Sequence, residues 1–523
     1  MVIAAAVAER LVTLQWTPST TSRVLFRSSI QDDRFGFMFN FPARHRWQPG
    51  AKFRSGSTPA DLEADLRRAA ERWNARLFGS PTIEGTLPAA TTFLGQFIAH
   101  DLSFDARAAL HSTREPIANL RTPRFDLDSL YGGGPAATPQ YFQSADRRLF
   151  AIGSNAGSTG SRKSRPELDL LRSPDASADW ELTDPMSRRR TAVIPDPRND
   201  ENILVGQLHL AFQLFHNRIV RETNCSFEDA RYAVRHAYHG IILRDFLIPV
   251  CGSEIMNELH HGEQGSRFRH FRRRGFVPYE FAMALFRFGH SMVGESYHLN
   301  DDLESSRQGK AIRFAREDLD DDRSRDRMAH SHLDGGRVLP LRWTVQWDRL
   351  LHSPSRPPGS REPNDAGGMQ KAQSIDLRIS PPLSGLPLEV ETPIERSLPY
   401  RTLLRGSQIG LPTGAWVAER VVGSRAVLPS VYVDEPDPLW IYILREAALC
   451  PVSGGQLGPV GARLVAEVCY GLLLNDPTHG LAPSSPAPVF SLGLEPGLVQ
   501  LIEFAGLPIS RADWMRYVGV EGR

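Results

Sequence analysis

Apolar residues recur at helical spacing in several separate stretches of the chain. One stretch includes Leu62, Leu66 and Trp73, which fall on a single helix face. Thr58 and Pro59 come directly before it, as an N-cap and a first helical residue would. The same kind of pattern predicts further helices over about 88–104, 200–223, 227–247, 278–293, 437–450 and 459–474.

Long connections separate these predicted helices, and β signals are sparse. Residues 1–57 carry little periodicity, so we expect an extended N-terminal arm over a core formed by residues 58–523. Residues 105–200 contain turn signals and a Ser/Arg/Pro-rich stretch, and the polar, breaker-rich residues 353–373 predict a mobile loop. The predicted fold class is therefore mainly α, with one large helical domain, long loops and little β structure.

Composition excludes several classes of protein. The 523 residues allow about three domains or one large one, and 61 Lys+Arg against 60 Asp+Glu give a net charge of +1. This balance argues against a nucleic-acid-binding or polybasic membrane-binding surface. No run of about 20 apolar residues predicts a transmembrane segment. The short N-terminal apolar run lacks a preceding basic region, so we expect no signal peptide and a soluble, cytoplasmic protein by default, although secretion stays open.

The four cysteines do not form a recognisable metal or disulfide pattern. Cys225, Cys251, Cys450 and Cys469 lie far apart and in no CxxC spacing, so neither a zinc site nor a disulfide framework is expected. We expect reduced thiols.

The segment GQFIAHD combines ionisable side chains with helical spacing. Gln96 and His100 are four residues apart and share a helix face, whereas Asp101 points about 100° away. One helix could therefore direct His100 into a cavity and Asp101 toward a second site. The alternative for Gln96 and His100 is a hydrogen-bonded core pair.

Two further segments place charged residues at predicted helices. In FRFGH, Arg287 lies three residues before His290, and Gly289 would let a bulky group approach the backbone. A core histidine and a buried ion pair are the alternatives there. Arg198 and Glu201 lie at the start of a long apolar helix, where nearby carboxylates suit the helix dipole.

Oxygen-bearing side chains alternate in TPRFDLD, residues 122–128. Such spacing suits Ca²⁺, which binds several hard oxygens, but it also suits an ordinary polar turn. His209 and His216 are seven residues apart on one stripe, and we expect both to be core residues.

Taken together, and in the order in which they occur along the chain, the segments resemble the peroxidase–cyclooxygenase superfamily, the animal-type haem peroxidases, and its bacterial members most. The resemblance runs from about Arg34 to Leu474, and it includes C-terminal segments such as LLRGSQIGLPTG and DPLWIYILREA. It implies a helical domain around haem b, with bound Ca²⁺. By position, His100 corresponds to the distal acid–base, Gln96 to its neighbour in the cavity, Arg198 to the distal arginine, His290 to the iron ligand and Arg287 to a partner of a haem propionate. The corresponding calcium ligands are Asp101, Thr122, Arg124 through its carbonyl, Asp126 and Asp128.

The chain departs from the family pattern at several positions. Ala99 stands where a carboxylate forms an ester to haem in vertebrate members, so at most one ester link is expected, through Glu201. Asn202 excludes the sulfonium link of one vertebrate member. Thr402 replaces the Asn that supports the proximal imidazole, and its hydroxyl has a shorter reach.

The resemblance implies a peroxidase that reduces hydrogen peroxide and oxidises a small organic or halide donor. A fatty-acid oxygenase is the first alternative, but such enzymes carry a radical Tyr where this chain has Arg287. A haem-binding degenerate peroxidase without turnover and a structural α protein without haem are the others. The sequence does not indicate an oligomeric state.

Overall fold

Helices dominate the architecture, as the periodicity predicts. The computed structural model describes residues 35–47, 59–78, 82–104, 119–155, 169–173, 191–261, 268–271, 275–301, 312–313, 332–339, 341–352, 368–386, 392–432, 435–450, 454–476 and 497–518. Its α-helices are α2 Pro59–Leu77, α3 Ala89–Leu102, α4 Asp128–Tyr131, α5 Gly134–Ala137, α6 Ile203–Thr223, α7 Phe227–Ile241, α8 Ile248–Cys251, α9 Ser253–His261, α10 Tyr279–Met283, α13 Leu398–Ile409, α14 Gly414–Val422, α15 Leu439–Ala448, α16 Pro459–Asn475, α17 Leu498–Ala505 and α18 Arg511–Val518. The mainly α fold class is confirmed.

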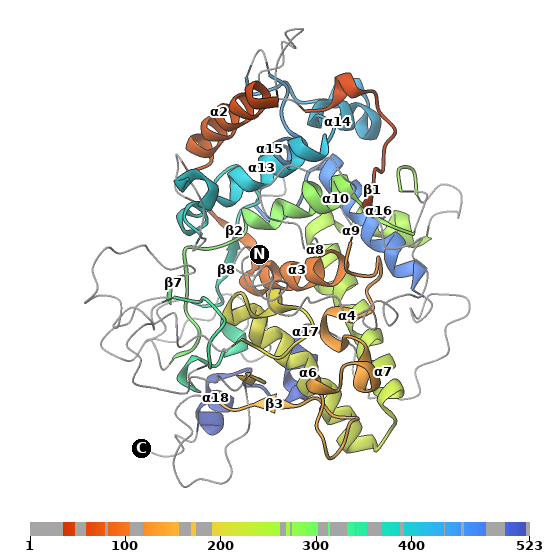
Figure 1. Cartoon of the computed structure of the whole chain (residues 1–523), viewed down its shortest axis with the longest axis vertical. Coiled ribbons are helices and arrows are strands. Elements are labelled where there is room, and N and C mark those ends of the chain that lie inside the picture. Colours follow the sequence, from red (N-terminus) through yellow and green to blue (C-terminus); the bar gives the residue numbers. More distant parts are fainter. Residues whose placement is uncertain are drawn as a thin grey trace, which may run out of the picture.

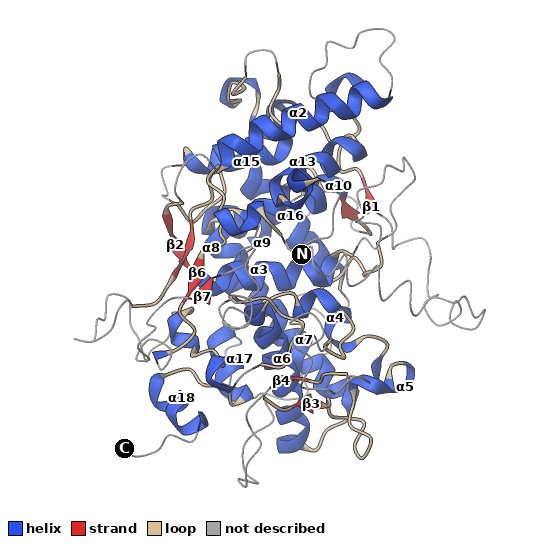
Figure 2. Ribbon diagram, turned by 60° about the vertical axis from the view of Figure 1, so that its left-hand side comes forward, coloured by secondary structure: helices blue, strands red, loops and turns tan. Residues whose placement is uncertain are grey.

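Strand structure is confined to short pairs in the described ranges. The strands are β1 Phe35–Gly36, β2 Glu84–Pro88, β3 Ile152–Gly153, β4 Asp169–Leu170, β5 Val277–Pro278, β6 Ser296–Tyr297, β7 Ile312–Arg313 and β8 Lys371–Gln373. β1 pairs with β5 in parallel, whereas β2 with β8, β3 with β4 and β6 with β7 are antiparallel. Figure 2 shows these strands as small pieces at the margins of the helical body.

The central helix is α3, which lies in the middle of the molecule (Figure 1). It packs against α4, α6, the 3₁₀-helix η3 (Pro197–Asp200) and the 3₁₀-helix η5 (Leu285–His290). The hydroxyl of Thr92 on α3 donates a hydrogen bond to the carbonyl oxygen of Met292, just beyond η5, at 3.3 Å. Three segments that are distant in sequence therefore meet at one helix.

Two of the predicted helices differ from the helices that the structure shows. The helix expected over 278–293 is divided into α10 and η5 at Ala284, whose φ of −140° and ψ of −66° are not helical. The helix expected over 227–247 continues past α7, but its last residues, Ile242–Leu247, form a π-helix. The Thr58 cap lies outside the described residues.

Parts of the predicted arm and loop also lie outside the described residues. Of the arm, residues 35–47 are described, and they lie on the core because the backbone N–H groups of Met38 and Phe39 donate to the buried carboxylate of Glu280 at 2.9 and 3.2 Å. Residues 353–367 of the predicted mobile loop are not described. The last three residues of that loop, Lys371–Gln373, form β8.

The described ranges have one dominant core. Nearly all of their buried apolar side chains form one contiguous cluster, which includes α3, α6, α15 and α16. All four cysteines are free thiols. No helix in the described part of the chain has both the length and the apolar run needed to cross a bilayer.

Candidate active site

His100 on α3 lies against two neighbouring residues of η3. Its ring is fully buried, and Nδ1 lies 2.9 Å from Oδ1 of Asn199. Arg198 donates from Nη2 to the backbone carbonyl oxygen of His100 at 2.9 Å. The structure thus brings His100 and Arg198, which are 98 residues apart, into direct contact.

The guanidinium of Arg198 is held in place by a buried carboxylate. Asp196 accepts from Nε of Arg198 at 3.0 Å and from Nη2 at 2.7 Å, and it also accepts from Arg121 at 2.7 Å. The ring of Phe104 lies under the Arg198 guanidinium, 4.4 Å from centroid to carbon. Burial alone would raise the pKa of Asp196, but the two guanidinium groups hold it well below its usual range. Asp196 therefore stays ionised and positions Arg198.

The second nitrogen of His100 has no hydrogen-bond partner in the described structure. Nε2 is buried and unpaired. Burial, and after it the charge of Arg198, lower the pKa of His100 well below its usual value. The ring is therefore neutral near pH 7, with one nitrogen free to exchange a proton with a ligand.

Gln96 lies one turn before His100 but is bonded elsewhere. Its Nε2 donates to Glu201 at 3.2 Å, and its Oε1 accepts from Nδ2 of Asn202 at 3.1 Å. Asn202 also caps α6 by accepting from the backbone of Val205 at 3.0 Å. The structure therefore groups Gln96 with Glu201 and Asn202 rather than with the His100 ring.

His290 is the last residue of η5, and it is also without a partner. Its side chain is buried, and neither ring nitrogen has a hydrogen bond within the described structure. Its pKa is lowered well below its usual value by burial and then by Arg287. The edge of Trp440 packs on the ring with centroids 6.0 Å apart. A Cβ at Gly289 would meet no atom within 4 Å, so there is open space beside His290.

Arg287, three residues before His290, lacks a carboxylate partner among the described residues. It donates to the carbonyl oxygen of Ala282 at 3.2 Å and to Oγ1 of Thr402 at 3.4 Å. Burial, and after it the charge of Arg401, lower the pKa of Arg287 to about 10, so the side chain remains cationic. Since Thr402 bonds Arg287, it does not support the ring of His290 here. A buried, unneutralised guanidinium suits an anionic group of a ligand.

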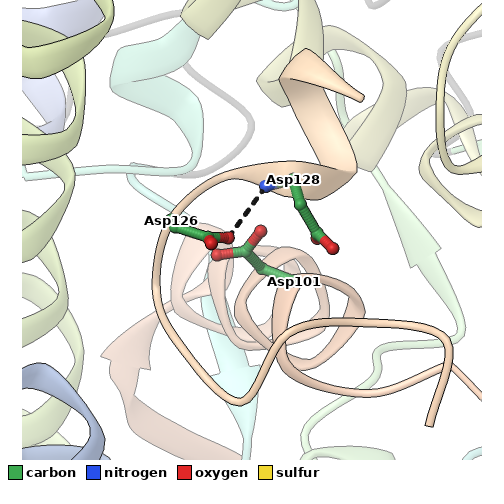
Figure 3. A group of neighbouring side chains, drawn as sticks. All are labelled: Asp101, Asp126 and Asp128. Atoms are coloured by element: carbon green, nitrogen blue, oxygen red, sulfur yellow. Dashed lines mark hydrogen bonds between the residues drawn. The ribbon is translucent and has the colours of Figure 1, made fainter. Parts of the chain in front are cut away.

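Three carboxylates converge beside α3 (Figure 3). Asp101 comes from α3, Asp126 from the loop before α4 and Asp128 from the first position of α4, and one oxygen of each lies within 4.8 Å of the other two. Asp101 accepts from the backbone of Leu127 at 3.2 Å and from Ser129 at 3.0 Å. These bonds hold the loop on the helix that carries His100.

The electrostatics of this cluster favour a cation. Burial and then Asp128 raise the pKa of Asp101, and burial raises the pKa of Asp128 to about 7. Arg121 lies 3.7 Å from Asp128 and offsets only part of the charge. Oγ1 of Thr122 and Oδ1 of Asp128 are buried and have no hydrogen-bond partner. Buried oxygens of this kind are suited to bind a hard cation. Arg124 lies in the same loop, and the role of its carbonyl remains a prediction.

Asn199 and Asp196 contribute to this site in a way that the sequence does not indicate. The sequence predicts no role for Asn199 and places Asp196 only among the carboxylates that suit the helix dipole, although both lie beside Arg198. His209 contacts Asn199, with its Nδ1 3.0 Å from Nδ2 of the amide. Both His209 and His216 are buried core residues as predicted, and His216 is hydrogen-bonded to Tyr131 at 3.1 Å and to the carbonyl oxygen of Arg148 at 2.8 Å.

Comparison with known proteins bears on the family and the fold. The animal haem peroxidase family matches residues 107–334. This span includes Arg198, His290 and the acidic loop, which we define as residues 122–128. The solved structure of peroxidase A from Dictyostelium discoideum is similar with a TM-score of 0.51 and 12% identity, over 93% of this chain and 93% of that chain. A structure of the Oryza sativa fatty acid alpha-dioxygenase with palmitic acid is similar with a TM-score of 0.50 and 11% identity, over 99% of this chain and 94% of that chain. No curated protein matches the sequence. The predicted resemblance to the superfamily is confirmed, whereas its bacterial part stays a prediction, and at these identities the two structures share the fold alone.

Proposed function

From the match to the animal haem peroxidase family and the fold shared with a known peroxidase, we propose that this chain is a haem-dependent peroxidase. It reduces hydrogen peroxide and oxidises a small organic or halide donor. The observation that carries the proposal is the pair of buried histidines, His100 and His290, whose unpaired nitrogens lie on elements that pack against each other.

The residues around His290 fit a haem. Its neutral imidazole would be the iron ligand, and the cationic Arg287 would pair with a propionate. Gly289, the residue before His290, has no atom within 4 Å of the position that a Cβ would take. When bound, the haem supplies the redox centre at which peroxide is reduced and a donor is oxidised.

His100 and Arg198 supply the acid–base chemistry on the other side. Nε2 of His100 accepts the proton from one oxygen of hydrogen peroxide and returns it to the other oxygen, which then leaves as water. Arg198 contributes a fixed positive charge in a site that is largely shielded from water, where such a charge stabilises developing negative charge strongly. Asp196 keeps that charge in position. Gln96, bonded to Glu201 and Asn202, limits the cavity rather than transferring a proton.

Covalent attachment of the haem is limited to one position. Ala99 offers no carboxylate, so only Glu201 could form an ester, and its carboxylate accepts a hydrogen bond from Gln96. The proposed cofactor is therefore haem b with at most one covalent link to the protein.

Calcium would complete the site next to His100. Asp101, Thr122, Asp126 and Asp128, with the carbonyl of Arg124, provide the hard oxygens that Ca²⁺ prefers. Because Asp101 is the next residue after His100, a bound ion would fix the helix that carries the acid–base group.

The fold is shared with a fatty acid oxygenase as well, so the fold does not choose between the two reactions. Residue 287 favours the peroxidase, since a cationic Arg occupies the place of the phenol that such oxygenases require. Incubation with linoleate followed by product analysis separates the two, and we expect no oxygenated fatty acid.

The test of the proposal is one spectrum and one assay. The protein is purified with haem supplied, its Soret band is recorded, and hydrogen peroxide and a chromogenic donor are added. We expect a Soret band and donor oxidation that depends on peroxide. Haem binding without donor oxidation would instead identify a degenerate peroxidase, and no Soret band would mean that the chain does not hold haem.

A further inference from the structure

Asn199 connects two buried histidines through the two ends of its amide. Its Oδ1 lies 2.9 Å from Nδ1 of His100, and its Nδ2 lies 3.0 Å from Nδ1 of His209. All three side chains are fully buried, so water does not compete for these bonds. The short helix η3 fixes the amide, because the backbone N–H of Asn199 donates to the carbonyl oxygen of Asp196 at 3.0 Å.

The chemistry of an amide dictates which nitrogen of each ring carries hydrogen. A carbonyl oxygen only accepts, so Nδ1 of His100 must be the protonated nitrogen. An NH₂ group only donates, so Nδ1 of His209 must be the unprotonated one. A neutral imidazole has a single N–H, and Nε2 of His100 is therefore the nitrogen with the free electron pair.

His209 lies at the NH₂ end of the amide and can act as its acceptor. Burial lowers the pKa of His209 to about 3, so its ring is neutral and able to accept. The edge of Phe97, whose centroid lies 6.2 Å away, packs against the ring. With the NH₂ end bound to His209, the carbonyl end of Asn199 faces His100.

We propose that Asn199 is a positioning residue that holds His100 in the Nδ1–H tautomer, with His209 setting the orientation of the Asn199 amide. The consequence rests on the proposed peroxidase function: Nε2 of His100 is then ready to accept a proton from hydrogen peroxide. In the opposite tautomer, Nε2 would already carry the hydrogen of the neutral ring and would have no electron pair with which to accept a proton from hydrogen peroxide.

The test begins with the full chain without haem, labelled with ¹⁵N-histidine. Two-bond ¹H–¹⁵N spectra distinguish Nδ1–H from Nε2–H rings, and His100→Gln and His209→Gln variants assign the two signals. We expect His100 as Nδ1–H and His209 as Nε2–H. His100 found as Nε2–H would overturn the proposal.

Two substitutions at one position separate the tautomer role from mere packing. Asn199→Asp can accept from both rings but cannot donate, so His100 should stay Nδ1–H while His209 changes to Nδ1–H. Asn199→Ala should release His100 from the Nδ1–H form. Asn217 is a buried asparagine of α6 that bonds the backbone of Phe150 at 2.7 and 3.0 Å, so Asn217→Ala is the control and should change neither ring. An unchanged His100 tautomer in Asn199→Ala, or an unchanged His209 tautomer in Asn199→Asp, would contradict the assignment.

Haem-loaded protein then links the tautomer to the reaction. Asn199→Ala should react with hydrogen peroxide about 10- to 100-fold more slowly, and Asn199→Asp should recover most of the rate. If the tautomers change as expected but the rates do not, the positioning role fails while the proposed function stands. If the parent protein loads haem but does not react with peroxide, the proposed function fails, and the spectra of the haem-free chain still decide the tautomer.

Discussion

His100 and His290 differ in what surrounds their rings, although both are buried and neutral. Asn199 bonds one nitrogen of His100, and Arg198 bonds its backbone, so this ring is oriented by protein alone. His290 has no hydrogen bond from the described residues, and Trp440 makes only a ring contact with it, at an interplanar angle of 72°. A ring that is desolvated without any partner is costly, which indicates that its partner is a ligand.

Replacing His290 should therefore remove the haem rather than unfold the protein. His290→Ala is expected to lower the haem content and to shift or abolish the Soret band, because the iron loses its protein ligand. The measurement is the ratio of Soret to 280 nm absorbance after haem loading. His236→Ala, a half-buried histidine on α7, is the control and should load like the parent. Equal haem content in the two variants would exclude His290 as the ligand.

The sequence predicted the identities of these residues but not their contacts. His100, Arg198, His290 and Arg287 were recognisable because their segments occur in one order. The role of Asn199 was not, since it depends on a ring 99 residues away and on the direction of an amide. Thr402 shows the same limit, because its hydroxyl was expected near His290 and instead bonds Arg287.

At the scale of elements, α3 carries the proposed acid–base residue, His100, and a proposed calcium ligand, Asp101, at consecutive positions. His100 faces η3, and Asp101 faces the acidic loop, as the 100° offset on a helix predicts. Three converging carboxylates repel each other unless a cation is present, so calcium should stabilise this end of α3.

Calcium removal should therefore lower the thermal stability. Chelation is expected to reduce the melting temperature, and Ca²⁺ at about 100 times its Kd should restore about 2.7 kcal/mol. Asp126→Asn should weaken this response, since it removes one charged ligand. Asp146→Asn changes an aspartate that pairs with Arg148 outside the cluster, and it should respond to chelator like the parent. Identical melting curves with and without chelator would argue against a calcium site.

A second prediction concerns Glu280, on which residues 35–47 are anchored. Burial raises the pKa of Glu280 to about 7 from a usual value of 4.5. The folded state therefore binds more protons than the unfolded state between these values, and this group lowers stability as pH rises from 4.5 to 7. The effect is up to about 3 kcal/mol.

Glu280→Gln should flatten that part of the stability profile. Denaturant unfolding at several pH values between 4.5 and 8 measures it, and Glu254→Gln, at an exposed position, is the control. A Glu280→Gln profile that falls as steeply as the parent profile would refute the assignment.

The positions of most helices followed from periodicity, and the exceptions have a structural cause. The break at Ala284 was not visible, because apolar residues continue through it on both sides. Tertiary packing, which the periodicity does not encode, places Arg287 and His290 on the separate 3₁₀-helix η5, where a continuous helix was expected.

The whole molecule is a helical framework that brings distant segments to one place. The length allowed three domains, yet the described ranges share one dominant core, and α3, η3 and η5 meet within it (Figure 1). The near-neutral charge agrees with a site whose charges are buried and mostly paired, such as Asp196 with Arg121 and Arg198. Arg287 is the exception in the described site, and it marks where an anionic ligand group would lie.

The central claim is that His100 transfers the proton of peroxide at a haem held by His290. Stopped-flow mixing of the haem-loaded protein with hydrogen peroxide, followed at the Soret band, tests it most directly. We predict that His100→Ala keeps the Soret band but reacts about 10²- to 10⁴-fold more slowly than the parent. A His100→Ala variant that retains haem and reacts at the parent rate would contradict the account.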